Sequence, residues 1–139
     1  MPQRDYILRM IEQMGAVLAE VRRKILGGAS SEEVRQELAD IAAQGGVDLE
    51  LAKGFDLETL VMLVAPTGEI EPSRGWLMAE ILYLDGLDAT LTDRPARESL
   101  LKARALFAMM RPHPALFVGI AEADERISEI DGLLETALQ

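Results

Sequence analysis

The chain has 139 residues, which is enough for one domain that buries its core without disulfides or a structural metal. It contains no cysteine, so disulfides, thiolate zinc sites and cysteine nucleophiles are excluded and a cytoplasmic protein is expected. The formal net charge of −10, from 14 basic and 24 acidic side chains, would repel a polyanion, so we expect no nucleic-acid partner.

The charge is spread unevenly along the chain. Residues 1–26 carry five basic and three acidic groups, residues 27–91 three and thirteen, and residues 92–139 six and eight. The first residues lack a basic stretch followed by an unbroken apolar core, which argues against a secretory signal. Charged residues interrupt every apolar stretch before the ~20 residues of a membrane span, so a membrane protein is not expected.

Residues 4–26 are predicted to form the first helix, which Gly27-Gly28 ends. Its apolar residues include a series with the alternating spacing of four and three that is typical of a coiled-coil seam: Ile7, Ile11, Met14, Leu18, Val21 and Ile25. Two interpretations remain open. The seam mediates a homodimer, or the helix uses the whole face in its own core. Docking on an anionic membrane is disfavoured because the polar face also carries acidic residues.

Three helix starts are predicted from capping residues. Ser30, with Glu33 three residues later, opens a second helix that ends at Gly45-Gly46. Asp48 is expected to cap a short piece that ends near Lys53. Asp56 is expected to cap a fourth helix over residues 57–65.

A fifth helix is predicted from Pro72, in its first turn, to about Leu91. Few of its positions are strongly polar, and they are Arg74, Glu80, Asp85 and Asp88. Such a helix belongs in the middle of the fold. Its small residues are spaced so that a neighbouring helix can approach closely, and they are Gly75, Ala79 and Gly86.

The sixth helix is predicted over about 94–111, with Thr92-Asp93 as its cap. Pro114 is expected to open a seventh helix that runs to about Leu138. Its inward face would consist of apolar residues at helical spacing, namely Phe117, Ile120, Ile127, Ile130, Leu134 and Leu138. No segment shows the alternation of a strand. The sequence therefore predicts a single all-α domain of about seven helices over residues 1–139.

The segment from Asp5 to Met14, DYILRMIEQM, resembles the opening of a family of short all-helical bacterial proteins known only as a domain of unknown function. In that family an amphipathic first helix precedes a degenerate tetratricopeptide-like helical hairpin. Residues 76–115 are similar to such a hairpin at Trp76, Leu82, Gly86, Leu87, Ala103, Phe107 and Pro112 or Pro114. The resemblance implies one isolated hairpin within residues 72–139, followed by a long C-terminal helix. A true repeat array normally needs about three repeats.

Three familiar site chemistries do not fit the residues. A di-iron bundle needs a repeated Glu-x-x-His pattern, whereas His113 is the one histidine in the chain. Asp85, Asp88 and Asp93 lack the ligand spacing of a calcium loop. The turn Gly27–Ser31 lacks the lysine and the preceding strand of a phosphate loop. We therefore predict no metal, no cofactor and no catalytic constellation.

Two surfaces are candidates for a peptide groove. Arg97, Arg104 and Arg111 lie seven residues apart on one helix face, where they pair with Glu122, Glu125 and Glu129 or receive an acidic peptide. Trp76 and Tyr83 are on one stripe of the fifth helix, as core residues or as the floor of an open groove. The candidate groove residues are Trp76, Tyr83, Arg97 and Arg104.

The leading functional hypothesis is a helical protein–protein interaction or scaffold protein, homodimeric, that accepts a peptide or protein partner. The alternative is a sensor whose methionine-rich interior encloses a small apolar ligand. An enzyme comes third, because no spacing of titratable groups assigns acid, base or nucleophile roles.

Overall fold

A computed structural model describes the backbone of residues 2–115 and 120–137 and the side chains of residues 13–115 and 120–136. Over these residues the chain forms seven α-helices and no strand, which confirms the predicted all-α class. The helices are α1 (Pro2–Leu26), α2 (Ser31–Gln44), α3 (Leu49–Gly54), α4 (Leu57–Val64), α5 (Pro72–Leu91), α6 (Arg97–Met110) and α7 (Ala123–Ala137).

The three predicted capping residues are confirmed. Ser30 accepts a hydrogen bond from the Glu33 N–H at the start of α2, and Asp48 does the same for α3. Asp56 accepts from the Thr59 N–H at 2.8 Å and opens α4. Each cap satisfies a backbone donor that the first helical turn leaves without a partner, and this local chemistry sets where these helices begin.

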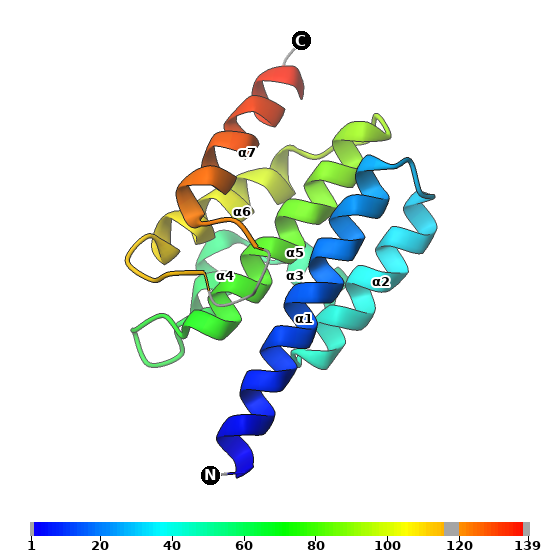
Figure 1. Cartoon of the computed structure of the whole chain (residues 1–139). Coiled ribbons are helices and arrows are strands. Elements are labelled where there is room, and N and C mark those ends of the chain that lie inside the picture. The colour runs from blue at the N-terminus through cyan, green and yellow to red at the C-terminus, as the bar shows by residue number, and fades with distance from the viewer. Residues whose placement is uncertain (1, 116–119, 138–139) are drawn as a thin grey trace.

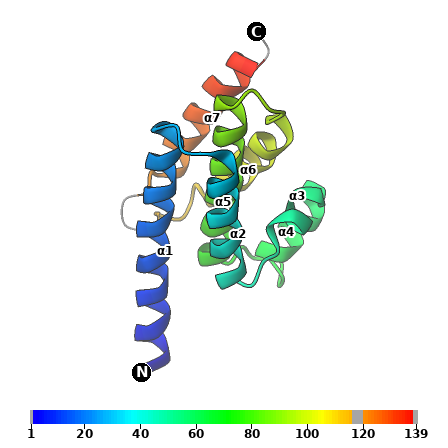
Figure 2. The ribbon, with the colours of Figure 1, turned by 90° about the vertical axis from the view of Figure 1, so that its right-hand side faces the viewer.

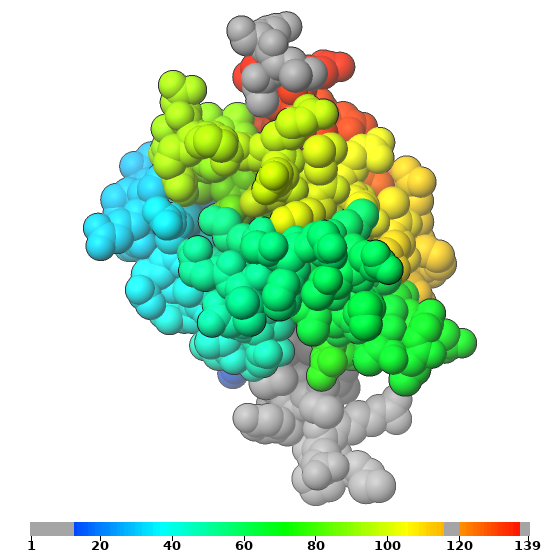
Figure 3. All heavy atoms as spheres, turned by 180° about the vertical axis from the view of Figure 1, so that it is seen from behind, coloured from blue at the N-terminus to red at the C-terminus, as the bar shows by residue number. Residues whose placement is uncertain are grey.

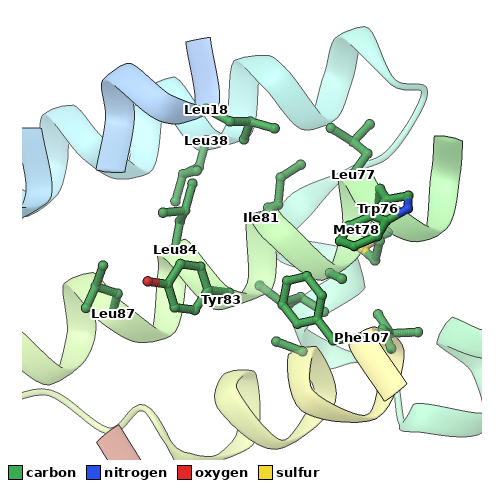
Figure 4. Packing of buried hydrophobic residues seen from close by; sticks show 14 of the residues in the cluster. Leu18, Leu38, Trp76, Leu77, Met78, Ile81, Tyr83, Leu84, Leu87 and Phe107 are labelled. Atoms are coloured by element: carbon green, nitrogen blue, oxygen red, sulfur yellow. The ribbon is translucent and has the colours of Figure 1, made fainter. Parts of the chain in front are cut away.

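Helix α5 is the centre of the fold. Every residue from Gly75 to Ala89 is buried. Leu18 of α1 and Leu38 of α2 approach α5 from one side, whereas Phe107 of α6 lies on the opposite side (Figure 4). Because α5 is enclosed from several directions, its polar residues must find partners inside the protein.

Helices α5 and α6 form a closely packed antiparallel hairpin. A Cβ atom placed on Gly86 would lie 2.5 Å from Leu100 Cδ2, and one placed on Gly75 would lie 2.5 Å from Met110 Sδ. The predicted close approach at these glycines is therefore confirmed. Phe107 completes the contact, with its ring centroid 5.9 Å from that of Trp76 in an edge-to-face arrangement.

The predicted start of the sixth helix is wrong. Asp93 has a φ of 57°, in the left-handed region, and does not cap α6. Instead, the Arg94 N–H donates to Ala89 O and the Asp93 N–H donates to Thr90 O, which is the hydrogen-bond pattern of a Schellman motif. The pair Thr92-Asp93 therefore terminates α5, and α6 begins three residues later than predicted, at Arg97.

The predicted start of the seventh helix is also wrong, because α7 begins at Ala123 and not at Pro114. The Ala115 N–H donates to both carboxylate oxygens of Glu122 at 3.1 Å, which ties this end of the connection to the start of α7. Three of the predicted inward residues, Ile120, Ile127 and Ile130, are buried. Phe117 and Leu138 lie outside the described residues.

Candidate functional site

The seam predicted on the first helix divides into two parts. Met14, Leu18, Val21 and Ile25 are buried in the core of their own chain, at 5% exposure or less. For these four residues the structure supports the alternative in which the helix face serves its own domain. The side chains of Ile7 and Ile11 lie outside the described set. The predicted dimer seam of six residues is therefore wrong for the four buried residues. For Ile7 and Ile11, which precede Met14, contact with a second copy stays a prediction.

The amino-terminal turns of α1 project beyond the ends of α2 and α5 (Figures 1 and 2). Gln44, the last residue of α2, lines the same surface depression as Ala16 and Val17, which shows that α2 ends level with the middle of α1. We call residues 2–12 the arm. At 1.5 Å per residue the arm is roughly 16 Å long.

An apolar cleft opens at the same end of the molecule. It is lined by the turn Gly45–Val47 after α2, by Leu63 and Val64 of α4, and by Arg74, Leu77, Met78 and Ile81 of α5, so one charged side chain borders an otherwise apolar lining. Its volume is about 130 Å³. Gly45 allows the turn to lie against α5, since a Cβ atom at this position would collide with the side chain of Leu77.

Helix α4 borders this cleft and exposes large apolar side chains. Leu60 and Val64 are buried, whereas Met62 is 67% exposed and Leu63 is 40% exposed. An apolar helix of this kind is normally covered on all sides. Helices α3 and α4 form much of the surface in Figure 3, where they are coloured green. Of the eight exposed large hydrophobic residues among the described side chains, four belong to these two helices: Leu51, Leu57, Met62 and Leu63.

The peptide groove predicted from Trp76, Tyr83, Arg97 and Arg104 is not formed. Trp76 and Tyr83 are completely buried, so they are core residues and not the floor of an open groove. Arg104 pairs with Asp131 of α7, at 2.6 Å and 3.2 Å. Arg97 is exposed at the first residue of α6, beside a different cavity. The four residues therefore share no surface, because the stripe on α5 is covered by α6.

The arginine face of α6 pairs with α7, as one of the two interpretations predicted. Arg104 binds Asp131, and Arg111 Nε lies 2.9 Å from an oxygen of Asp124. The acidic partners differ from those expected from the sequence, which were Glu122, Glu125 and Glu129. The later start of α7 changes which acids face α6, since the helix has no turn before Ala123.

A buried ion pair joins α5 to α7. The Arg126 guanidinium donates to both carboxylate oxygens of Glu80, at 2.8 Å and 3.1 Å, and both side chains are nearly inaccessible to solvent. Arg126 also lies 4.6 Å from the centroid of the Tyr83 ring and donates to Glu129. The Tyr83 hydroxyl donates to Glu129 and accepts from Arg22 Nε at 3.1 Å. The network links α1, α5 and α7.

Burial governs the pKa values of Glu80 and Tyr83 in this network. It raises the pKa of Glu80 above its ordinary value, although the charge of Arg126 opposes the shift. Burial and the hydrogen bond to Glu129 raise the pKa of Tyr83 to about 12.

Sequence reasoning missed the role of Arg126. Its position between Ala123 and Ile127, on the inward face of α7, is the signal that could have indicated a buried arginine with an acidic partner.

The two other acids of α5 are also paired with different elements. Asp85 lies 3.3 Å from Lys53 Nζ of α3 and accepts from the Ser99 hydroxyl of α6 at 2.8 Å. Asp88 accepts from Arg94 at 2.5 Å and from the Ser31 hydroxyl of α2 at 3.3 Å. These contacts satisfy the buried carboxylates, so they explain the acids of α5 as structural groups.

A surface cavity of about 750 Å³ lies next to Asp85 and Arg94 and has Arg97 on its wall. Its charged lining residues are of both signs, with Lys53 and Glu98 among them.

Over the described residues there is no group of three or more histidine, cysteine or acidic side chains arranged to hold a metal ion. Within the same part of the chain, no helix combines the length and the apolar character needed to cross a bilayer.

Comparison of the chain with protein-family models, curated proteins and solved structures found no match. The resemblance of residues 76–115 to a tetratricopeptide-like hairpin therefore stays a prediction. The interpretation of the arm and the cleft depends on their geometry alone.

Proposed function

We propose that this protein is a helical protein–protein interaction protein that acts as a homodimer, with the arm as its self-association element. The observation that carries the proposal is the projection of α1 beyond α2 and α5 (Figures 1 and 2). A helical segment of this length has little stability by itself in water, so it needs packing against another surface.

The composition of the arm supports an apolar contact. Five of its eleven residues are apolar or aromatic, and they are Tyr6, Ile7, Leu8, Met10 and Ile11. Ile7 and Ile11 continue the spacing of Met14 and Leu18, which α2 and α5 cover in the same chain. Because α2 ends level with Ala16, a second copy is the natural source of cover for the preceding turns.

The size of the apolar cleft argues against this cleft as the site of a small apolar ligand. Sites for small molecules typically have volumes of 300–1,000 Å³. The cleft between α2, α4 and α5 holds about 130 Å³, which suits one side chain. The proposal includes a cytoplasmic setting, supported by the absence of cysteine, and a tetratricopeptide-like character of the α5–α6 hairpin, supported by its antiparallel packing.

Sedimentation equilibrium tests the proposal. We expect the intact protein to be dimeric at tens of micromolar and an Ile7→Glu, Ile11→Glu variant to be monomeric. Gln13→Glu is the control, because Gln13 is exposed on the same helix and the change adds a negative charge outside the seam. Circular dichroism must show that the variants keep their helices. An intact protein that is monomeric at these concentrations would refute the proposal.

A further inference from the structure

We propose that the outer surface of α3 and α4 binds a basic amphipathic helix of a different protein. We call this surface the α3–α4 face. It consists of exposed apolar and acidic side chains, namely Leu51, Leu57, Met62, Leu63, Asp48, Glu50, Asp56 and Glu58. The inference goes beyond the proposed function, because it concerns a surface other than the arm and does not depend on self-association.

Helix α4 is more apolar than its own domain requires. Its sequence, LETLVMLV, is apolar at six of eight positions. Leu60 and Val64 are its buried residues. With about 3.6 residues per turn, Met62 lies on the opposite side of the helix from these two, where it is 67% exposed. A helix that is apolar all round is normally enclosed, so the open side of α4 has the character of a binding surface.

The acids of the α3–α4 face give it a negative charge. Among the described residues, no ion pair includes any of the four, which are Asp48, Glu50, Asp56 and Glu58. Two lysines lie beside them. Lys53 is paired with Asp85, and Lys102 of α6 donates to the Lys53 carbonyl at 2.7 Å, near Asp56. Four acids against these two lysines leave a face that attracts cations.

A second copy of the chain does not supply the complementary charge. The whole chain carries −10, so two such faces repel each other. Of the twelve arginine and lysine side chains in the described set, nine are already in ion pairs with acids of the same chain. The arm has two basic and two acidic groups and therefore no net charge. Charge complementarity thus selects a different protein that is rich in lysine or arginine.

The architecture of the face favours a helical partner. A peptide that binds as an added strand needs a sheet edge, and the described residues form no strand. An amphipathic helix carries an apolar stripe flanked by polar side chains. Its stripe can pack on Met62 and Leu63, where the flexible methionine adapts to the incoming side chains, while its basic residues face the acids.

A synthetic peptide tests the inference. The probe is a fluorescent peptide of about 18 leucine and lysine residues, with the leucines three and four positions apart so that one face of its helix is apolar. A scrambled peptide of the same composition is the control probe. We expect fluorescence anisotropy to show binding of the probe to the intact protein, about tenfold weaker binding of the scrambled peptide, and weaker binding of the probe at high salt.

One pair of variants tests the apolar part of the face. Met62→Gln with Leu63→Gln should weaken binding of the probe by about tenfold. Leu26→Gln with Leu91→Gln is the matched control, because these two leucines are exposed on other elements. Should circular dichroism show that the first variant has unfolded, Met62→Gln alone replaces it and is judged by the same outcomes.

A second pair of variants tests the acids. Glu50→Gln with Glu58→Gln should weaken binding and reduce its salt dependence. Glu125→Gln with Glu135→Gln removes the same charge from exposed positions on α7 and should leave binding unchanged. Equal effects of the two double variants would mean that the net charge of the protein, and not this face, attracts the probe, which would overturn the inference.

The remaining outcomes separate the inference from the proposed function. The arm variant, Ile7→Glu with Ile11→Glu, should be monomeric and still bind the probe; loss of binding would place the probe on the arm. The inference also fails if the intact protein binds the two peptides equally or if the Met62 and Leu63 variant binds the probe normally. It fails if that variant loses self-association, since a second copy then covers the face, or if the protein cosediments with phosphatidylcholine–phosphatidylglycerol vesicles. An intact protein that is monomeric but binds the probe at this face refutes the proposed function alone.

Discussion

Helices α5 and α4 are both rich in apolar residues, but they differ in what surrounds them. Helix α5 is buried over fifteen consecutive residues, from Gly75 to Ala89, and its buried acids are each paired with another element. Helix α4 has eight residues against the twenty of α5 and leaves Met62 and Leu63 exposed. Polar residues inside α5 connect elements of the chain, whereas α4 places apolar residues on the outside of the molecule.

The comparison predicts opposite sensitivities to mutation. Changes at the partners of α5 should lower the free energy of unfolding of each chain. Changes at the exposed residues of α4 and in the arm should leave the folding of one chain nearly unaltered, and changes in the arm should weaken association. The predictions below follow this contrast from the largest effect on folding to the smallest.

The largest effect is expected for Arg126→Ala. This substitution leaves the carboxylate of Glu80 buried without its partner, and breaking a buried pair in this way typically costs about 3–5 kcal/mol. Urea unfolding of the variant measures the loss. The double variant Glu80→Leu, Arg126→Met removes both charges, and we expect it to recover most of the stability. A single variant as stable as the intact protein would show that the pair contributes nothing.

The next effect is expected for Gly86→Ala, which tests the close packing of α5 on α6. The added Cβ atom would lie 2.5 Å from Leu100 Cδ2, and overpacking of this kind costs about 1–3 kcal/mol. Gly132→Ala in α7 is the matched control, because a Cβ atom there meets no atom within 4 Å. Replacing an unpacked helical glycine should stabilise the protein by about 0.5–1 kcal/mol. Equal unfolding midpoints for the two variants would contradict the predicted contrast.

Tyr83 gives a pH dependence that reports on the same core. Burial raises its pKa to about 12, from an ordinary value of 10.0. The folded state therefore holds the phenol proton more tightly than the unfolded state. The resulting stabilisation is complete below about pH 10 and is lost as the pH rises through about 12.

Ultraviolet absorbance of tyrosinate measures this titration in a Tyr6→Phe variant, where Tyr83 is the remaining tyrosine. We expect ionisation near pH 12, or together with unfolding, as followed by circular dichroism. A tyrosinate signal with a midpoint near pH 10 in protein that is still folded would show that the hydroxyl is accessible.

The smallest effect on folding is expected for Met62→Gln. The side chain is 67% exposed, and surface substitutions usually change stability by no more than about 0.5 kcal/mol. Thermal unfolding at a concentration well below that of self-association measures the stability of the single chain. A loss comparable to that of Gly86→Ala would mean that the side chain of Met62 is packed in the core.

Local sequence chemistry predicted much of the fold. Ser30, Asp48 and Asp56 cap helices in the predicted way, because a cap depends on residues three positions apart. Asp93 shows the limit of this reasoning. Aspartate favours the N-cap position and also tolerates the left-handed conformation. At the end of α5, the Schellman motif places Asp93 in the left-handed conformation, so Asp93 does not act as an N-cap.

The candidate site was less predictable, because it depends on long-range packing. The spacing of the seam on α1 could not show that α2 ends level with Ala16, which separates the buried part of the seam from the arm. Trp76 and Tyr83 are spaced equally well for a groove and for a core, and Phe107 of α6 decides for the core. The pairing of Glu80 with Arg126 spans 46 residues, beyond the reach of any local pattern.

Site-directed cross-linking tests self-association through the arm most directly. The chain has no cysteine of its own, so an Ile7→Cys variant and a Glu135→Cys variant each carry a single thiol. Glu135 is exposed on α7, and the carboxyl end of α7 lies at the opposite end of the molecule from the arm (Figure 1). A bis-maleimide reagent should link two copies of the Ile7→Cys variant efficiently and two copies of the Glu135→Cys variant poorly; equal yields for the two variants, or no linkage of Ile7→Cys, would contradict the proposal.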